Sequence, residues 1–342
     1  MSFVKRLTAV TLTVLLTFFV LTGCSDKGEL TSGGNDKDFP VTIQGVTIQD
    51  EPAGVVVLSQ NLADVILAMS YEISLKGKSA ECTQEDLSVL PNMTVQDVQQ
   101  IKDAGADLVL LDSDPGEAEK QSLNQAGIDV LVIPAAANRE DFERLYEEVG
   151  AAIKGGQTGY THGKETAQDI FYTVDDIERV IPDSDITITM CYLYDTEGNA
   201  VTGDQFARKL IESAGLTNAF SGSDSGVVDI ESLKIANPQY IFCDIGVKQE
   251  LSQKEGYQDL DAVKNGMVYE LDASYLDRQG RGMIQAILFM AAQIYPELME
   301  SSDPVSSMEA PENFLDSSTP QDDPSVSSSG SSSQTTTSSS ST

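Results

Sequence analysis

The chain has 342 residues, of which 54 are acidic and 21 are basic, so its formal net charge at pH 7 is −33. A field this negative repels nucleic acids and anionic lipid headgroups, which excludes binding to either through overall charge. A single histidine, His162, is too few for a multi-histidine metal site, and we expect it to serve no hydrolytic triad. We therefore expect no metal, no cofactor and no enzymatic activity.

The first 23 residues have the pattern of a signal peptide. Lys5 and Arg6 precede an uncharged run, residues 7–21, that is short for a membrane span and ends in small residues. A plain signal peptide or an uncleaved anchor would share these features. The run closes with the letters LTGC, which resemble the lipobox of bacterial lipoproteins. That resemblance implies cleavage before Cys24 and a lipid on its thiol, and hence an extracytoplasmic protein anchored to the cell membrane.

After a flexible linker over residues 24–39, strands alternate with helices through residues 40–150. The turn Ser59-Gln60-Asn61 follows the first apolar strand and can cap the helix after it. Alternation at this spacing predicts parallel βα units and a first α/β lobe. The expected strands are 55–58, 108–111 and 130–133, and the expected helices are 62–69, 95–104 and one that ends before residue 126.

A long helix is predicted at residues 166–181, within a connecting segment at 151–183. Its apolar side chains recur at spacings of three and four and form one continuous stripe, and Pro182 ends it. The stripe consists of Ala167, Ile170, Phe171, Val174, Ile177, Val180 and Ile181.

A second lobe is predicted at residues 184–300, because residues 231–244 repeat the pattern of residues 99–112. Each copy has a helical turn, a break at small residues and an apolar strand that ends at Asp112 or Asp244. The other expected elements are strands at 186–190 and 268–271 and helices at 205–214 and 283–295. We thus predict two similar α/β lobes with mostly parallel sheets, joined by one long helix, with a ligand cleft between them. The Ser/Thr-rich tail, 301–342, is expected to be disordered.

Three cysteines follow Cys24. Cys191 and Cys243 both lie near the ends of predicted strands, where they could form a disulfide or stay as two buried thiols. The sequence leaves both possibilities open.

From about Pro52 to Glu300 the chain resembles the helix-linked, two-lobed substrate-binding proteins of ABC importers for ferric siderophores, haem and cobalamin. The resemblance depends on the order and spacing of several short motifs. These are the strand followed by SQN at 55–61, ADLVL at 106–110, AGIDV at 126–130, the long helix, IESL at 230–233 with NP at 237–238, and NGMVY at 265–269.

The resemblance also implies a contact with the importer permease. In the family, one glutamate near the start of each repeated unit projects from its lobe and pairs with permease arginines. The matching position in the second lobe is Glu231, whereas the first lobe has Gln99 there, with Asp97 the nearest acid. Glu231 could equally be an ordinary acidic residue at a helix start, where the macrodipole favours it.

The ligand-binding candidates follow the C-terminal ends of predicted strands. Tyrosines offer stacking area and a hydroxyl, although packing at a strand end is an equally good role for Tyr192 and Tyr194. Arg278 and Arg281 precede a helix N-terminus, which disfavours cations, so a ligand anion or the nearby Asp272 or Asp277 should compensate them. The full candidate set is Ser59, Gln60, Asn61, Tyr192, Tyr194, Tyr275, Arg278 and Arg281.

The predicted function is therefore capture without catalysis. A monomer anchored to the membrane would bind an iron complex (a siderophore or haem) or cobalamin and deliver it to an ABC importer. The alternative is a lipid-anchored sensor or adhesin that uses the same fold without transport.

Overall fold

The computed structural model describes residues 31–32, 37–182 and 186–296, with side chains described from residue 37. The predicted signal peptide, Cys24, most of the predicted linker and the Ser/Thr-rich tail lie outside the described residues. In the described part, no helix is long and apolar enough to cross a membrane.

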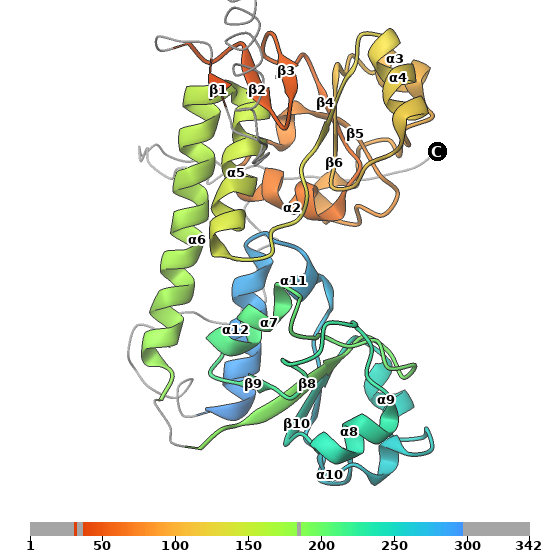
Figure 1. The fold of residues 1–342 in the computed structure, drawn as a ribbon, viewed down its shortest axis with the longest axis vertical. Coiled ribbons are helices and arrows are strands. Elements are labelled where there is room, and N and C mark those ends of the chain that lie inside the picture. Colours follow the sequence, from red (N-terminus) through yellow and green to blue (C-terminus); the bar gives the residue numbers. More distant parts are fainter. Residues whose placement is uncertain (1–30, 33–36, 183–185, 297–342) are drawn as a thin grey trace, which may run out of the picture. The chain divides into compact units, whose positions relative to one another are not determined.

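The first lobe contains a four-stranded parallel sheet in the order β5-β4-β6-β7. Every residue of β4 and β6 is buried, because helices and loops cover both faces of the sheet (Figure 1). The strands are β4 (Val55–Val57), β5 (Leu75–Lys78), β6 (Leu108–Leu111) and β7 (Asp129–Val132), and the helices are α2 (Gln60–Ala68), α3 (Val98–Asp103) and α4 (Glu117–Gln125). Short 3-10 turns occupy Glu72–Ser74 and Glu85–Leu87.

A small antiparallel sheet of β1 (Thr31–Ser32), β2 (Val41–Ile43) and β3 (Val46–Ile48) precedes the first lobe and was not predicted. Its hairpin turns at Gln44 and Gly45, whose φ angles are 49° and 79°. A two-residue hairpin turn of type I′ requires positive φ angles at both of its central residues.

The second lobe has the same topology as the first. Its parallel sheet is ordered β11-β10-β8-β9, so in both lobes the first strand lies between the second and the third. The strands are β8 (Thr189–Leu193), β9 (Thr217–Asn218), β10 (Tyr240–Cys243) and β11 (Val268–Glu270). The helices are α7 (Ala207–Ser213), α8 (Ile230–Ala236), α9 (Val247–Leu251), α10 (Asp261–Lys264), α11 (Ser274–Asp277) and α12 (Gly282–Ile294). The 3-10 turn Tyr257–Asp259 precedes α10.

The repeated pattern in the sequence corresponds to α3–β6 in the first lobe and α8–β10 in the second. Both strands take the third position of their sheets, which confirms the two similar lobes. The strand predicted at 186–190 was wrong in its bounds: β8 runs over 189–193, and the side chain of Ile186 is 71% exposed.

The lobes are joined by α6 (Tyr160–Val180), which is longer at its start than the predicted helix. It packs along α5 (Arg139–Lys154), an unpredicted helix, and a single π-helical turn at Gly155–Gly159 separates the two. Glycines allow this close packing, since a Cβ on Gly163 would lie 2.1 Å from the Tyr146 carbonyl oxygen. Most of the predicted stripe is buried, but Val180 is 39% exposed. The lobe boundaries near residues 150 and 184 remain a proposal.

One hydrophobic core runs through both lobes and α6, and a smaller core covers the other face of each sheet. Cys191 and Cys243 are buried free thiols in β8 and β10, so the alternative of a disulfide between them is not observed.

Candidate ligand cleft

The first lobe supplies the loops at the C-terminal ends of β4, β5 and β6 to a cleft. Ser59 lies in the loop after β4 and caps α2, because its Oγ accepts a hydrogen bond from the Leu62 N–H at 3.2 Å. The same hydroxyl donates to Asp112 Oδ2 at 2.5 Å and so fixes the carboxylate that follows β6. The order of strands in the sheet therefore brings two distant loops together at one edge.

The second lobe contributes the segment from Asp272 to Arg278, which contains α11. Asp272 Oδ1 accepts from the Ser274 N–H at 2.8 Å, and Asp244, which follows β10, holds the Ala273 N–H at 3.0 Å. Asp277 accepts a hydrogen bond from the Tyr194 hydroxyl at 2.6 Å. Burial raises the pKa of the Asp277 carboxyl above its usual range.

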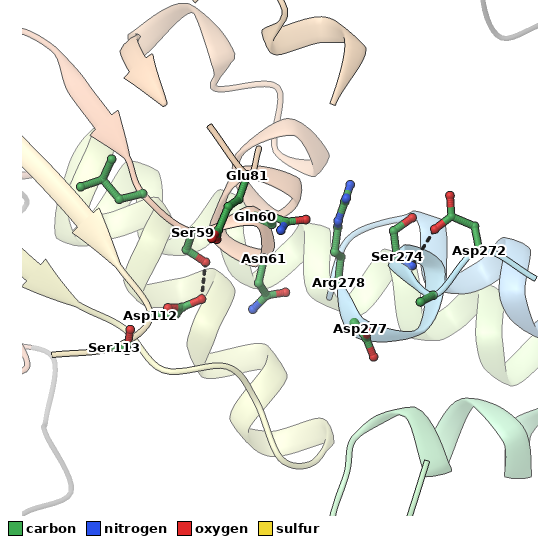
Figure 2. A pocket seen from close by; sticks show the side chains of 12 residues that line it. Ser59, Gln60, Asn61, Glu81, Asp112, Ser113, Asp272, Ser274, Asp277 and Arg278 are labelled. Carbon is green, nitrogen blue, oxygen red and sulfur yellow. Dashed lines mark hydrogen bonds between the residues drawn. The ribbon is translucent and has the colours of Figure 1, made fainter. Parts of the chain in front are cut away.

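Together these segments line a cleft of about 500 Å³. Its walls come from both lobes, and its polar side chains project from opposite sides (Figure 2). The lining residues are Leu58, Ser59, Gln60, Asn61, Glu81, Asp112, Ser113, Asp272, Ala273, Ser274, Asp277 and Arg278. The structure thus brings the three predicted residues of the SQN turn and Arg278 into one cavity.

The side chain of Gln279 joins the lobes beside this cleft. It is 2% exposed, its Oε1 accepts from the Ala136 N–H at 2.8 Å, and its Nε2 donates to the Ala136 carbonyl at 2.6 Å. The Tyr146 hydroxyl donates to the Gln279 carbonyl at 2.8 Å. A buried and fully bonded amide of this kind fixes the local orientation of the two lobes.

Two predicted tyrosines make internal packing contacts, and neither is among the residues that line the cleft. Tyr192 is fully buried, and its hydroxyl donates to the Leu271 carbonyl at 2.6 Å. The hydroxyl of Tyr194 is engaged by Asp277, and the two tyrosine rings pack edge to face with centroids 5.2 Å apart. The reason is the position of β8, because Tyr192 belongs to the buried strand and does not follow it.

Tyr275 and Arg281 lie in an adjoining hollow of about 300 Å³. Ser274 and Arg278 line both cavities and therefore form the boundary between them. The remaining residues of the hollow are Asp64, Leu67, Ala68 and Gly282.

Both arginines have internal acidic partners, but not the predicted ones. Arg281 pairs with Asp169 of α6 at 3.0 Å. Arg278 lies 4.0 Å from Asp64 of α2 and donates to Thr83 Oγ1 at 3.2 Å. Of the two nearby aspartates, Asp277 is within electrostatic reach of Arg278, whereas the ion-pair partners themselves come from elements far away in the sequence.

Sequence reasoning missed two residues near the cleft. Glu81 follows β5, whose sequence LKGK lacks the apolar run that marks a buried strand, so neither the strand nor the loop was predicted. Gln279 belongs to the arginine motif at 278–282, but no local pattern reveals a hydrogen bond to Ala136.

The predicted permease contacts lie on helices at the periphery of each lobe. The side chain of Glu231 is 75% exposed in the first turn of α8 and pairs with Lys234 at 3.3 Å. Gln99 is exposed on α3 and donates to Asp103 at 2.7 Å. Asp97 is half-buried, and its Oδ2 accepts from the Thr94 N–H at 2.7 Å.

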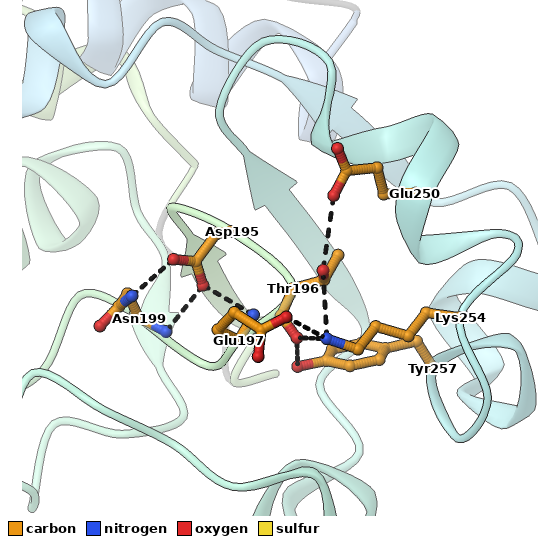
Figure 3. Close-up of polar contacts among 7 residues, drawn as sticks. All are labelled: Asp195, Thr196, Glu197, Asn199, Glu250, Lys254 and Tyr257. Atoms are coloured by element: carbon orange, nitrogen blue, oxygen red, sulfur yellow. Dashed lines mark hydrogen bonds and ion pairs between the residues drawn. The ribbon is translucent and has the colours of Figure 1, made fainter.

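The loop that follows β8 is also acidic, and a lysine from the segment after α9 pairs with it. Lys254 Nζ donates to the Thr196 carbonyl and lies 2.8 Å from the Glu197 carboxylate, and the Tyr257 hydroxyl donates to the same carbonyl at 3.1 Å (Figure 3). This loop does not line the cleft, and its Glu197 carboxylate is neutralised by Lys254 within the lobe.

The model of the periplasmic binding protein family matches residues 78–275, from β5 in the first lobe to α11 in the second. The chain is 24% identical over 311 residues to the uncharacterized ABC transporter substrate-binding lipoprotein YvrC of Bacillus subtilis, covering 86% of this chain and 98% of the relative.

Solved structures with the same fold include three from different bacteria. The periplasmic haem-binding protein RhuT of Roseiflexus has a TM-score of 0.61 at 16% identity, covering 71% of this chain and 98% of that one. An Fe³⁺-hydroxamate transport protein of Saccharomonospora viridis has a TM-score of 0.59 at 18% identity, with coverage of 75% and 99%. The vitamin B12 binding protein BtuF of Vibrio cholerae has a TM-score of 0.56 at 17% identity, with coverage of 72% and 97%.

Proposed function

Since the chain belongs to the periplasmic binding protein family, we propose that it is the solute-binding component of an ABC importer for an iron complex or a corrinoid. In this role it captures a ferric siderophore, haem or cobalamin outside the cytoplasm and delivers it to a permease. It binds as a monomer and does not change its ligand chemically.

One observation carries the proposal. A polar cleft lies where loops of the two lobes meet, and the family match, residues 78–275, covers part of each wall. Ligands of open α/β folds bind at the C-terminal ends of the strands, which is where these loops begin.

The lining of the cleft favours a hydrophilic ligand within the proposed group. Hydroxyl, amide and carboxylate side chains dominate it, and neither a histidine nor an aromatic ring is among the described residues of the lining. The axial ligand and flat apolar walls that suit haem are missing from this set. A siderophore therefore ranks before haem and cobalamin.

A direct test is a binding screen with the purified mature chain against ferric siderophores, haem and cobamides. Thermal shift reports stabilisation, because a ligand that binds only the folded state raises its melting temperature. Native mass spectrometry then gives the stoichiometry, the oligomeric state and the mass of the bound molecule. An absence of any shift across the panel would contradict the proposal, and a bound product of altered mass would contradict a role without catalysis.

The proposed anchor is a lipid on Cys24. The relative named as a lipoprotein supports this part, since the alignment covers nearly its whole length. We expect Cys24→Ser to move the protein from the membrane fraction to the medium or periplasm, because one anchored cysteine carries several acyl chains. Membrane retention of the variant would point to the alternative of an uncleaved signal segment.

The alternative of a sensor or adhesin without transport is favoured by one residue. Gln99 stands where the family pattern has the permease-binding glutamate of the first lobe. Co-purification of the detergent-solubilised protein with a permease separates the two functions. Reproducible capture of a permease supports transport, and ligand binding without any such partner favours the sensor.

A further inference from the structure

The charges that line the cleft are strongly unbalanced. Four carboxylates face it, two from each lobe, and Arg278 is the single cationic side chain among the described lining residues. The acids are Glu81 and Asp112 in the first lobe and Asp272 and Asp277 in the second.

The hydrogen bonds of these carboxylates bring no compensating cation, while burial raises the pKa of Asp277. Asp112 accepts from the Ser59 hydroxyl, Asp272 from a backbone N–H and Asp277 from the Tyr194 hydroxyl, and all three donors are neutral. In the described ranges, none of the four acids takes part in an ion pair. The loop after β8 shows the contrast, because there Lys254 neutralises Glu197.

Arg278 acts on one of the four acids, Asp277, and offsets their charge only in part. Its side chain is 17% exposed, and its guanidinium is directed to α2 and the loop after β5, where Asp64 lies 4.0 Å away and Thr83 accepts a hydrogen bond. Asp64 does not line the cleft, so it neutralises part of the positive charge of Arg278 from outside the cavity.

We propose that the cleft selects a solute with net positive charge, such as a metal chelate or corrinoid that carries an ammonium group or an uncompensated metal charge. Anionic chelates, including ferric catecholates and haem with its propionates, are disfavoured by the same carboxylates. A concave site between low-dielectric walls strengthens these interactions relative to those on an open surface. This inference rests on the proposed function and narrows its ligand class by charge.

The test uses ligands that differ in charge but little in shape. One pair is ferrioxamine B, a ferric trihydroxamate with a free ammonium group, and its neutral N-acetyl derivative. The second pair is cationic aquocobalamin and neutral cyanocobalamin, and a ferric triscatecholate and haem represent anions. Calorimetry should give the cationic member of the preferred pair an affinity about tenfold higher. The ratio should shrink as sodium chloride rises from about 0.05 M to about 0.5 M.

Isosteric variants of the cleft acids then test whether these carboxylates cause the preference for the cationic ligand. Asp112→Asn and Asp272→Asn keep an oxygen that can accept the observed hydrogen bonds, and Glu81→Gln loses no described side-chain contact. Each substitution should lower the affinity for the cationic ligand about three- to tenfold and the affinity for its neutral partner less than about twofold. Asp176→Asn on α6 removes an exposed acid far along the helix from the cleft and should change neither affinity.

The outcomes separate this inference from the proposed function. The charge selection would be overturned if a ligand binds tightly but the neutral or anionic member is preferred. It would also be overturned if the three cleft variants affect both members of a pair equally. Either result would leave the proposed function standing. No binding by any member of the panel would overturn the proposed ligand group, and the charge selection with it.

Discussion

Asn61 and Gln279 bond to each other twice beside the cleft, although 218 positions separate them in the chain. The Asn61 Nδ2 donates to Gln279 Oε1 at 3.2 Å, and the Gln279 N–H donates to Asn61 Oδ1 at 2.6 Å. Both residues are nearly buried, at 7% and 2% exposure. One amide of the second lobe is therefore bound to the start of α2 and to Ala136 in the first lobe.

Replacing Gln279 by Ala should destabilise the protein clearly. The variant leaves Asn61 Nδ2 and the backbone N–H and carbonyl of Ala136 without their partners in a buried place, at a cost of about 2–4 kcal/mol. Chemical denaturation should show this loss, and the melting temperature should fall by about 5–12 °C. Gln249→Ala, on an exposed face of α9, is the matched control and should change stability by less than about 0.5 kcal/mol. Similar effects of both variants would show that the bonds of Gln279 add no stability.

The same contact should limit lobe closure. Because α6 and the Asn61–Gln279 pair both connect the lobes, ligand binding should change the radius of gyration only slightly. Solution scattering with and without the best ligand of the binding screen measures this change. A large decrease on binding would contradict the stiff connection.

The positions of two tyrosines predict opposite phenotypes. Tyr192→Phe removes the hydrogen bond to the buried Leu271 carbonyl and should lower stability by about 1–2 kcal/mol while ligand affinity stays the same. Tyr275→Ala, at a residue that is 41% exposed beside the cleft, should lower affinity and leave stability within about 0.5 kcal/mol. Calorimetry and thermal denaturation of both variants decide the matter, and a loss of affinity in Tyr192→Phe would restore the original ligand-contact expectation.

Much of the fold could be predicted because buried parallel strands are continuous apolar runs. The strand at 108–111 was predicted with the bounds that β6 has, and the apolar stripe of α6 located the connection between the lobes. The helix α5 carried a signal that was overlooked: Asn138 caps it by accepting from the Asp141 N–H at 3.0 Å. The error at β8 arose because alternation in residues 186–190 was given more weight than the apolar residues at 190–193.

The site could be predicted only in part, because its long-range contacts have no local pattern. The SQN turn was found, since a capping serine and a strand end are local features. The pairings of Arg278 with Asp64 and of Arg281 with Asp169 join residues more than 100 positions apart. Sequence spacing offered only the neighbouring aspartates as partners, and these face the cleft or Tyr194 instead.

The difference between Gln99 and Glu231 predicts an asymmetric contact with the permease. Glu231 is an exposed acid of the second lobe at the matching position, whereas the amide of Gln99 is bonded to Asp103. Glu231→Ala should lower uptake about tenfold, the size expected when one interfacial charge pair is lost, and Gln99→Ala should have a much smaller effect. Transport assays in cells measure uptake, and calorimetry of the same variants should show unchanged ligand affinity. Equal losses in both variants would mean that the asymmetry has no role in docking.

The buried carboxyl of Glu148 predicts how stability depends on pH. The side chain lies in α5, is 2% exposed, and its two oxygens accept from Gln44 Nε2 at 2.9 and 3.0 Å. Burial raises the pKa of Glu148, the hydrogen bond from Gln44 and the charge of Arg144 oppose the increase, and Glu147 adds to it.

A carboxyl with a raised pKa in the folded state binds its proton more tightly there than in the unfolded chain. The unfolded state then loses its proton first as pH rises, so this group makes the folded state less stable between its unfolded pKa and its higher folded pKa, and the loss persists above that range. Glu148→Gln removes the buried charge and can still accept from Gln44. The variant should therefore melt about 2–4 °C higher than the unchanged protein near pH 8, with the difference vanishing near pH 4. Glu117→Gln, at a side chain that is 94% exposed on α4, is the control and should show little difference at either pH. A stabilisation by Glu148→Gln that is as large at pH 4 as at pH 8 would show that packing, and not ionisation, is the cause.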